Sequence, residues 1–237
     1  LVTGVQTCAL PIWKDTYHTI IYKLGIMNNF AVGIDEVTKM NAEVLSDLLY
    51  SVTQGRGKDR MKASTNEMRV NHTKWALPIV TTSNSSVRDK IASLKSTYDG
   101  EMMRLMEFRI DLTDNIPKEK AAEIFGALYE NYGHAADIYC SYLVQNRDKC
   151  IELVRKVQYK LDKDIGFQSR ERFWSAQAAC NIAGGLIAQS LGLHDYDMQK
   201  VYQWAVEELT GMRNNNVAPV VRSEEHTSEL QSLAYLV

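Results

Sequence analysis

Apolar residues near the start of the chain repeat at helical spacing. An amphipathic helix is predicted up to a stop at Gly25, because its apolar positions share one face; they are Trp13, Tyr17, Ile20, Ile21 and Leu24. A second amphipathic helix is predicted between a capping Asn41 and a terminating Gly55.

Two apolar runs lack the helical period. Residues 30–34 form a continuous run, which is typical of a buried parallel strand rather than of a half-exposed one. Residues 75–82 form the second run, but Pro78 interrupts it and donates no ladder hydrogen bond. The strand itself is therefore expected either to begin at Ile79 or to have a bulge at Pro78. Clean alternation at residues 108–112 predicts a third strand.

From Pro117 the pattern becomes helical throughout, and proline suits the first position of a helix. Five helices are predicted, at residues 117–131, 134–146, 148–161, 168–191 and 197–212. Gly184 and Gly185 lie inside one of them, which a close contact between helices would explain. We expect an α/β half at residues 13–116, a helical domain at 117–213 and a linker at 214–221.

The two ends of the chain are related to each other. The reverse complement of one possible coding sequence for residues 2–12, read in a shifted frame, encodes residues 222–232. Unrelated protein termini would not share this relation. We interpret residues 1–12 and 222–237 as translated sequencing-adapter DNA around a metagenomic fragment, and we exclude them from fold reasoning.

Composition sets broad bounds on the kind of protein. The 237 residues are 45% hydrophobic and 24% charged with a net charge of −2, as in an ordinary soluble protein. No apolar run is long enough to span a bilayer, so we expect a cytoplasmic protein without a membrane partner. The charge is locally uneven, because four cations crowd into residues 56–62. We call them the basic loop: Arg56, Lys58, Arg60 and Lys62.

Two carboxylates follow the first apolar strand directly. Asp35 at the carboxyl end of a parallel strand can hold Mg²⁺, and Glu36 beside it can activate a water, which is the Walker-B arrangement of nucleotide hydrolases. Asn84 follows the second strand 48 positions later, and Arg104 follows on a short helix that begins at Gly100. Ring-shaped ATPases have a polar sensor residue and an arginine in this order. A core strand that runs into an acidic turn is the alternative interpretation.

Four stretches resemble phage and prophage helicase–primase-type P-loop ATPases, which are similar in layout to superfamily-three viral helicases; they are residues 24–36, 48–58, 81–86 and 100–104. The resemblance covers residues 17–213 and is most specific at 28–112. It implies a bacterial host cytoplasm, ATP and Mg²⁺ as cofactors, Asp35 as the metal-site carboxylate and Glu36 as the catalytic base. It also implies Asn84 as the sensor and Arg104 as the arginine finger in a homo-oligomeric ring. The basic loop would then form a hairpin on single-stranded DNA, meeting phosphates rather than bases.

The phosphate-binding signature Gly-x-x-x-x-Gly-Lys-Ser/Thr occurs nowhere in the chain. We therefore expect the residues to be part of a P-loop ATPase core, whose phosphate loop preceded Trp13, and we expect this polypeptide alone to be inactive. Two other functions fit the sequence. One is a non-enzymatic helical adaptor that binds a partner, and the other is a DNA-packaging or plasmid-type motor.

Overall fold

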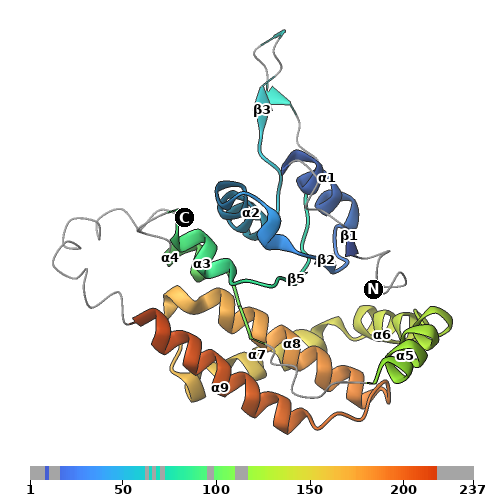
Figure 1. Cartoon of the computed structure of the whole chain (residues 1–237). Helices are drawn as coiled ribbons and strands as arrows, with labels where there is room; N and C mark the ends of the chain where they lie inside the picture. The colour runs from blue at the N-terminus through green and yellow to red at the C-terminus, as the bar shows by residue number, and fades with distance from the viewer. Residues whose placement is uncertain are drawn as a thin grey trace. The chain divides into compact units, whose positions relative to one another are not determined.

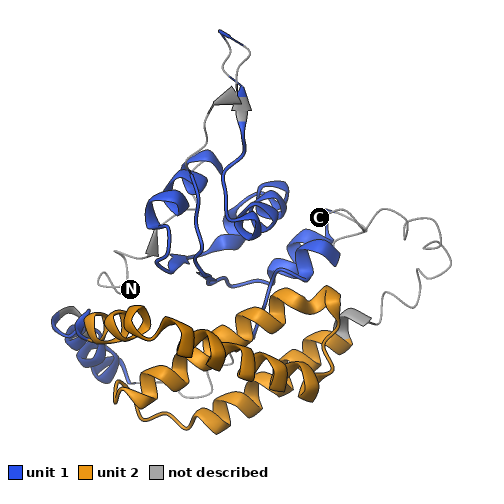
Figure 2. Cartoon of the chain, turned by 180° about the vertical axis from the view of Figure 1, so that it is seen from behind, with its two compact units in different colours: residues 1–134 blue, residues 135–237 orange. Residues whose placement is uncertain are grey.

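The structure is a computed structural model, and it describes residues 9–10, 17–61, 64–65, 68–69, 73–94, 99–109 and 117–217. The chain divides into two compact units, residues 1–134 and residues 135–237, shown in two colours in Figure 2. The boundary lies one helix beyond the change of pattern at Pro117. The chain is mostly helical, with a small parallel sheet in the first unit (Figure 1).

The first unit contains short strands, several helices and one 3₁₀ turn. In chain order the described elements are β1 (Ala9–Leu10), α1 (Tyr17–Met27), β2 (Val32–Ile34), η2 (Val37–Lys39), α2 (Ala42–Gln54), β3 (Arg60–Met61), β4 (Met68–Arg69), β5 (Ile79–Thr81), α3 (Val87–Ala92), α4 (Asp99–Met102) and α5 (Lys118–Glu130).

The parallel sheet has the strand order β1-β2-β5. Strand β2 pairs with β5 in parallel, with Val32 opposite Ile79 and Ile34 opposite Thr81. The two apolar runs are therefore neighbouring parallel strands. Strand β1 pairs with the other side of β2 and comes from the segment that we interpret as adapter sequence.

The first apolar run is shorter as a strand than residues 30–34. Phe30 precedes β2 and its side chain is 69% exposed. Pro78 explains where pairing begins, because its carbonyl accepts the N–H of Val32 at 3.1 Å while proline has no N–H to give in return. Strand β5 begins at Ile79, as the first of the two predicted alternatives has it, but Val80 is 63% exposed rather than buried.

The prediction that the first helix stops at Gly25 is wrong, because Gly25 lies inside α1. The helix ends at Met27, and Asn28 follows with φ 52°, the left-handed conformation that asparagine tolerates. Gly25 is needed for packing instead, because a Cβ there would lie 2.5 Å from the Cγ2 atom of Thr73. Trp13, the predicted first apolar residue of this helix, lies outside the described residues.

The predicted ends of α2 are confirmed, and helix α3 is capped in the same way. Asn41 accepts the N–H of Glu43 at 2.8 Å, and Gly55 ends α2 with φ 66°. Ser86 accepts the N–H of Asp89 at 3.1 Å at the start of α3. The third strand is predicted at residues 108–112. Of these the structure describes only Phe108 and Arg109, which have no regular structure.

The core of the first unit lies between the sheet and helices α1, α2 and α3. Its largest fully buried side chains come from α1, β2, α2 and α3, and they are Ile20, Leu24, Ile34, Leu45 and Ile91. Trp75 joins this core at 4% exposure and donates its indole N–H to the carbonyl of Val52 at 2.9 Å. Ile34, the last residue of β2, belongs to this core, so packing fixes the end of that strand.

The second unit is helical, and its described helices match the predicted ones within a few residues, with a 3₁₀ turn before α8. They are α6 (His134–Gln145), α7 (Arg147–Ile165), η3 (Ser169–Glu171), α8 (Arg172–Ser190) and α9 (Met198–Val217). Helix α8 packs against both α7 and α9 (Figure 1). The expected close contact at the glycine pair is present, since a Cβ on Gly185 would lie 2.5 Å from the Cε atom of Met198.

Candidate functional site

Polar side chains from two strand ends meet at one edge of the parallel sheet. Asp35 and Glu36 follow β2, and Thr82, Ser83 and Asn84 follow β5. Because β2 and β5 are parallel and paired in register, the segments that follow them leave the sheet at the same edge. Ligands of open α/β sheets bind at this edge, outside the carboxyl ends of the strands.

Thr82 fastens the two strand ends together. Its N–H donates to the carbonyl of Ile34 at 3.1 Å, and its own carbonyl accepts the N–H of Val37 at 3.2 Å. Its hydroxyl donates to the Oδ1 atom of Asp35. Sequence reasoning missed Thr82; the one available signal was its position directly after an apolar strand.

Glu36 lies between two polar partners. Its Oε1 atom accepts the Nδ2 amide hydrogen of Asn84 at 2.7 Å, across 48 positions of sequence. Its Oε2 atom lies 3.8 Å from the Nζ atom of Lys39, a second residue that sequence reasoning missed. The hydrogen bond from Asn84 therefore orients the carboxylate, and the longer contact with the half-exposed Lys39 adds little to it.

The backbone at Glu36 is left-handed, with φ 55° and ψ 43°. A non-glycine residue in this conformation costs on the order of 1–3 kcal/mol, and such residues cluster at functional sites. The turn allows two successive carboxylates to follow the strand while Val37 returns to the core at 2% exposure. The side chain of Glu36 is 28% exposed, and Asp35 and Asn84 are exposed, so solvent reaches this edge.

Asp35 and Thr82 together have the donor chemistry of a magnesium site. Mg²⁺ takes oxygen ligands and is commonly bound by one or two carboxylates plus substrate phosphates and waters. The Asp35 carboxylate and the Thr82 hydroxyl present such oxygens side by side. Among the described residues no group of three or more His, Cys, Asp and Glu side chains gathers as a metal site. An ion here would depend on phosphate oxygens for its remaining ligands.

The loop that carries Asn84 is held from its far end by Glu107. One carboxylate oxygen of Glu107 accepts the N–H of Val87 at 3.0 Å, and the other accepts the N–H of Arg88 at 3.2 Å and the hydroxyl of Ser86 at 3.3 Å. A carboxylate at a helix N-terminus satisfies otherwise unpaired amides and opposes the positive end of the helix dipole. Glu107 thus fixes the start of α3, three residues after Asn84.

Arg104, the predicted arginine finger, packs against α2. Its Nε atom donates to the hydroxyl of Thr53 at 3.0 Å, and its NH1 atom donates to the carbonyl of Gly100 at 2.6 Å. The guanidinium lies 4.5 Å from the centre of the Tyr50 ring. These contacts do not join Arg104 to Glu36 or Asn84, so the structure brings together three of the predicted nucleotide-site residues, and the fourth lies elsewhere.

The basic loop leads into the predicted hairpin, in which β3 and β4 pair antiparallel. Two of its cations lie near acids: Arg56 is 3.9 Å from Asp59, and Lys58 is 3.8 Å from Asp47. Both side chains are more than half exposed, so these contacts hold them weakly. Arg60 begins β3, and Lys62 lies outside the described residues.

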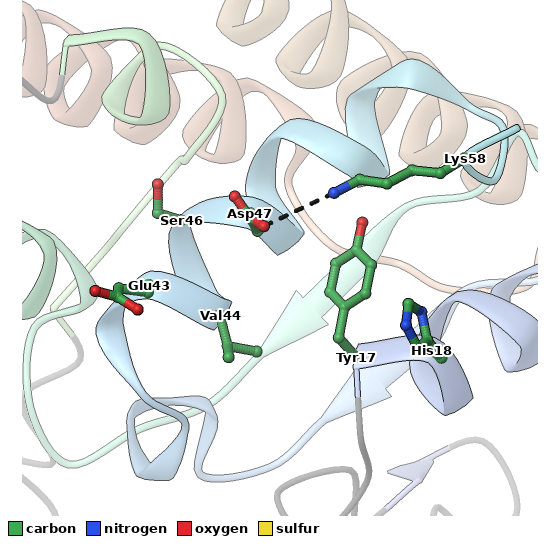
Figure 3. A pocket seen from close by; sticks show the side chains of 7 residues that line it. All are labelled: Tyr17, His18, Glu43, Val44, Ser46, Asp47 and Lys58. Carbon is green, nitrogen blue, oxygen red and sulfur yellow. Dashed lines mark ion pairs between the residues drawn. The ribbon is translucent and has the colours of Figure 1, made fainter. Parts of the chain in front are cut away.

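A pocket of about 560 Å³ opens beside the basic loop, between the starts of α1 and α2 (Figure 3). Lys58 reaches across its rim toward Asp47 and lies 5.1 Å from the centre of the Tyr17 ring. The remaining lining residues are His18, Glu43, Val44 and Ser46. None of the predicted catalytic residues lines this pocket, so it is separate from the edge that carries Glu36 and Asn84.

Comparison with solved structures finds a similar fold in the SCCmec type IV Cch active helicase, with a TM-score of 0.57 and 19% identity. The match covers 89% of this chain and 35% of that one, so the chain spans about a third of the helicase that it matches. At this identity the likeness concerns the fold. No protein-family model matches the chain, and no curated protein matches it.

None of the helices that the structure describes is long and apolar enough to cross a membrane.

Proposed function

We propose that this chain is part of a helicase-like, ATP-hydrolysing motor that acts on DNA, and that the sheet edge after β2 and β5 is its nucleotide-hydrolysis site. The observation that carries this proposal is the 2.7 Å hydrogen bond between Asn84 and Glu36. It joins the two strand ends at which a catalytic carboxylate and a polar sensor are expected. Support for the helicase class comes from the similar fold of the Cch helicase.

Glu36 acts in this proposal as the base that orients and deprotonates the attacking water. Asn84 holds one carboxylate oxygen, which leaves the remaining lone pairs to accept a hydrogen bond from that water. Its amide group can also reach the oxygens of the transferred phosphoryl group, which is the task of a sensor. Lys39 lies 3.8 Å from the other carboxylate oxygen and adds a positive charge beside the base.

Asp35 and Thr82 would hold a Mg²⁺ ion that comes with the nucleotide, and the ion would neutralise charge on the β- and γ-phosphates. The phosphate-binding loop of such a motor is not among the 237 residues, so it would belong to a longer protein. Arg104 as a finger for a neighbouring subunit would require its guanidinium to leave Thr53 and the Tyr50 ring. A homo-oligomeric ring would supply that neighbouring subunit.

The basic loop and its hairpin would contact single-stranded DNA. Arg56 and Lys58 are exposed and cationic, and the hairpin begins at Arg60. Their side chains would neutralise phosphates without reading bases, so affinity would depend on salt rather than on sequence. This contact would couple strand engagement to hydrolysis at the sheet edge.

Glu36→Gln in the longer protein tests the proposed site. The amide fills the same space but cannot take a proton, so hydrolysis should fall at least a hundredfold while ATP binding persists, given the roughly 10²–10⁴-fold contribution of general acid–base catalysis. Glu123→Gln is the matched control, because Glu123 is an exposed carboxylate on α5. Turnover of Glu36→Gln equal to that of the control would refute the base assignment. An absence of ATP binding in the wild-type protein would favour the adaptor function instead.

A further inference from the structure

The outward face of α7 carries an aromatic side chain surrounded by cations. Tyr159 is 74% exposed, although α7 buries Val157, Leu161 and Ile165 against its neighbours. At 100° per residue, Tyr159 points about 160° away from Val157 and Leu161, almost opposite the core. Its position therefore has no role in packing the second unit.

Cations surround this tyrosine on the helix surface. Arg155 lies one turn before it and Lys163 one turn after it, each about 40° from its direction, and Lys156 lies about 60° away. All three side chains are exposed. We call this set the α7 face: Arg155, Lys156, Tyr159 and Lys163.

The acids in this half of α7 turn toward other helices. Asp162 accepts the hydroxyl of Ser175 on α8 at 2.6 Å, and Asp164 accepts the hydroxyl of Tyr202 on α9 at 2.7 Å. Glu152 lies at the start of the face and is 2.7 Å from Lys156. Asp162 lies about 60° from Tyr159 on the side away from Lys156, but its carboxylate is bonded to Ser175. Apart from Asp162 and the Glu152–Lys156 pair, the charged side chains around Tyr159 are cationic, in a chain whose net charge is −2.

We propose that the α7 face binds single-stranded nucleic acid, with Tyr159 stacking on a base and Arg155 and Lys163 meeting the flanking phosphates. An exposed aromatic ring between cations has the two features that such binding needs: a platform for the π-face of a base and positive charge along the backbone. An acidic peptide would complement the cations but would leave the exposed ring without a matching group. The proposal deepens the proposed DNA-directed function, with which it shares its ligand, and it involves neither the Glu36 site nor the hairpin.

The test uses the whole chain with alanine at all four cations of the basic loop, so that the loop cannot contribute; they are Arg56, Lys58, Arg60 and Lys62. A labelled 20-nucleotide oligothymidylate and an abasic strand of the same length are titrated by fluorescence anisotropy at several salt concentrations. Tyr159→Ala should weaken oligothymidylate binding roughly five- to 150-fold, since stacking is worth about 1–3 kcal/mol per base. Affinity for the abasic strand should stay the same, and Tyr159→Phe should restore binding to oligothymidylate.

The double variant Arg155→Ala with Lys163→Ala should bind both strands more weakly. Its log–log salt slope should be smaller by about 1.4, or about 0.7 for each phosphate that is no longer neutralised. Tyr132→Ala is the control, because Tyr132 is 69% exposed and lies outside α7. The proposal is overturned if Tyr159→Ala binds oligothymidylate as tightly as this control does, or if it loses affinity equally for both strands. It is also overturned if the starting protein binds neither strand. Competition by polyglutamate as strong as by oligothymidylate would also overturn it. Hydrolysis does not enter these measurements, so failure here leaves the Glu36 proposal standing.

Discussion

A buried carboxylate joins α7 to α9 in the second unit, and its removal should destabilise that unit. Glu171 is 1% exposed and lies in the turn between α7 and α8. Its Oε1 atom accepts the Nε hydrogen of Arg213 at 3.3 Å, and its Oε2 atom accepts the N–H of Gln168 at 2.8 Å. Arg213 also donates to the carbonyl of Ile165 at 3.0 Å, so one arginine of α9 closes the end of α7.

The expected loss for Glu171→Ala follows from these contacts. Removal of one partner from a buried ion pair costs about 3–5 kcal/mol, because the other charge is left unpaired. The side chain of Arg213 is 24% exposed and keeps its bond to Ile165, so water and this carbonyl recover part of the loss. We expect a decrease of about 2–3 kcal/mol in the free energy of unfolding. Glu171→Gln keeps an acceptor for Gln168, so it should lose only about 1–2 kcal/mol.

Urea unfolding followed by circular dichroism at the helical signal measures these differences, with Glu207→Ala on α9 as the control. Glu207 is exposed, and such surface substitutions change stability by about 0.5 kcal/mol or less. If Glu171→Ala unfolds at the same urea concentration as the control, the ion pair with Arg213 does not hold α7 and α9 together.

Two further predictions concern DNA binding and alkaline stability. Alanine at Lys58, Arg60 and Lys62 should weaken single-stranded DNA binding to a similar degree for all DNA sequences. The log–log salt slope should fall by about 0.7 for each phosphate that the loop no longer neutralises. An unchanged slope would mean that the loop is solvated and does not contact DNA. Burial, with the hydrogen bond to Asp164 and that carboxylate's charge, raises the pKa of Tyr202 above its ordinary value of 10.0. Above pH 10 the unfolded chain therefore releases a proton that the folded chain keeps, and stability should fall by up to about 1.4 kcal/mol per pH unit. Tyr202→Phe should lose this component of the slope in urea titrations from pH 9 upward, whereas Tyr132→Phe should keep it.

The sequence predicted those parts of the fold that depend on local signals. Asn41 accepts an amide of its own helix, and Gly55 ends that helix in the left-handed conformation. These signals lie within a few positions of the ends that they mark, so a single sequence reveals them. The parallel pairing of β2 with β5 was also predictable, because the two apolar runs are separated by a helix.

The remaining contacts depend on residues that are far apart in the chain. Thr82 donates to Asp35 across 47 positions, and nothing in a strand-end threonine reveals its partner. Phe30 belongs to the apolar run but stays exposed, since pairing begins only at the carbonyl of Pro78. From the sequence alone, Arg104 would be expected to face solvent. Tertiary packing instead places it over the ring of Tyr50, which lies 54 positions earlier in the chain.

The most direct test of the proposed site is a double-mutant cycle between Glu36 and Asn84 on the rate of ATP hydrolysis in the longer protein. If the 2.7 Å hydrogen bond joins a base to the residue that positions it, the two side chains act as a unit. Asn84→Ala should then lower kcat in the wild-type background but have almost no further effect in Glu36→Gln. Rate losses that multiply fully in the double variant, or a Glu36→Gln enzyme that turns over ATP at the wild-type rate, would contradict the assignment of this sheet edge as the hydrolysis site.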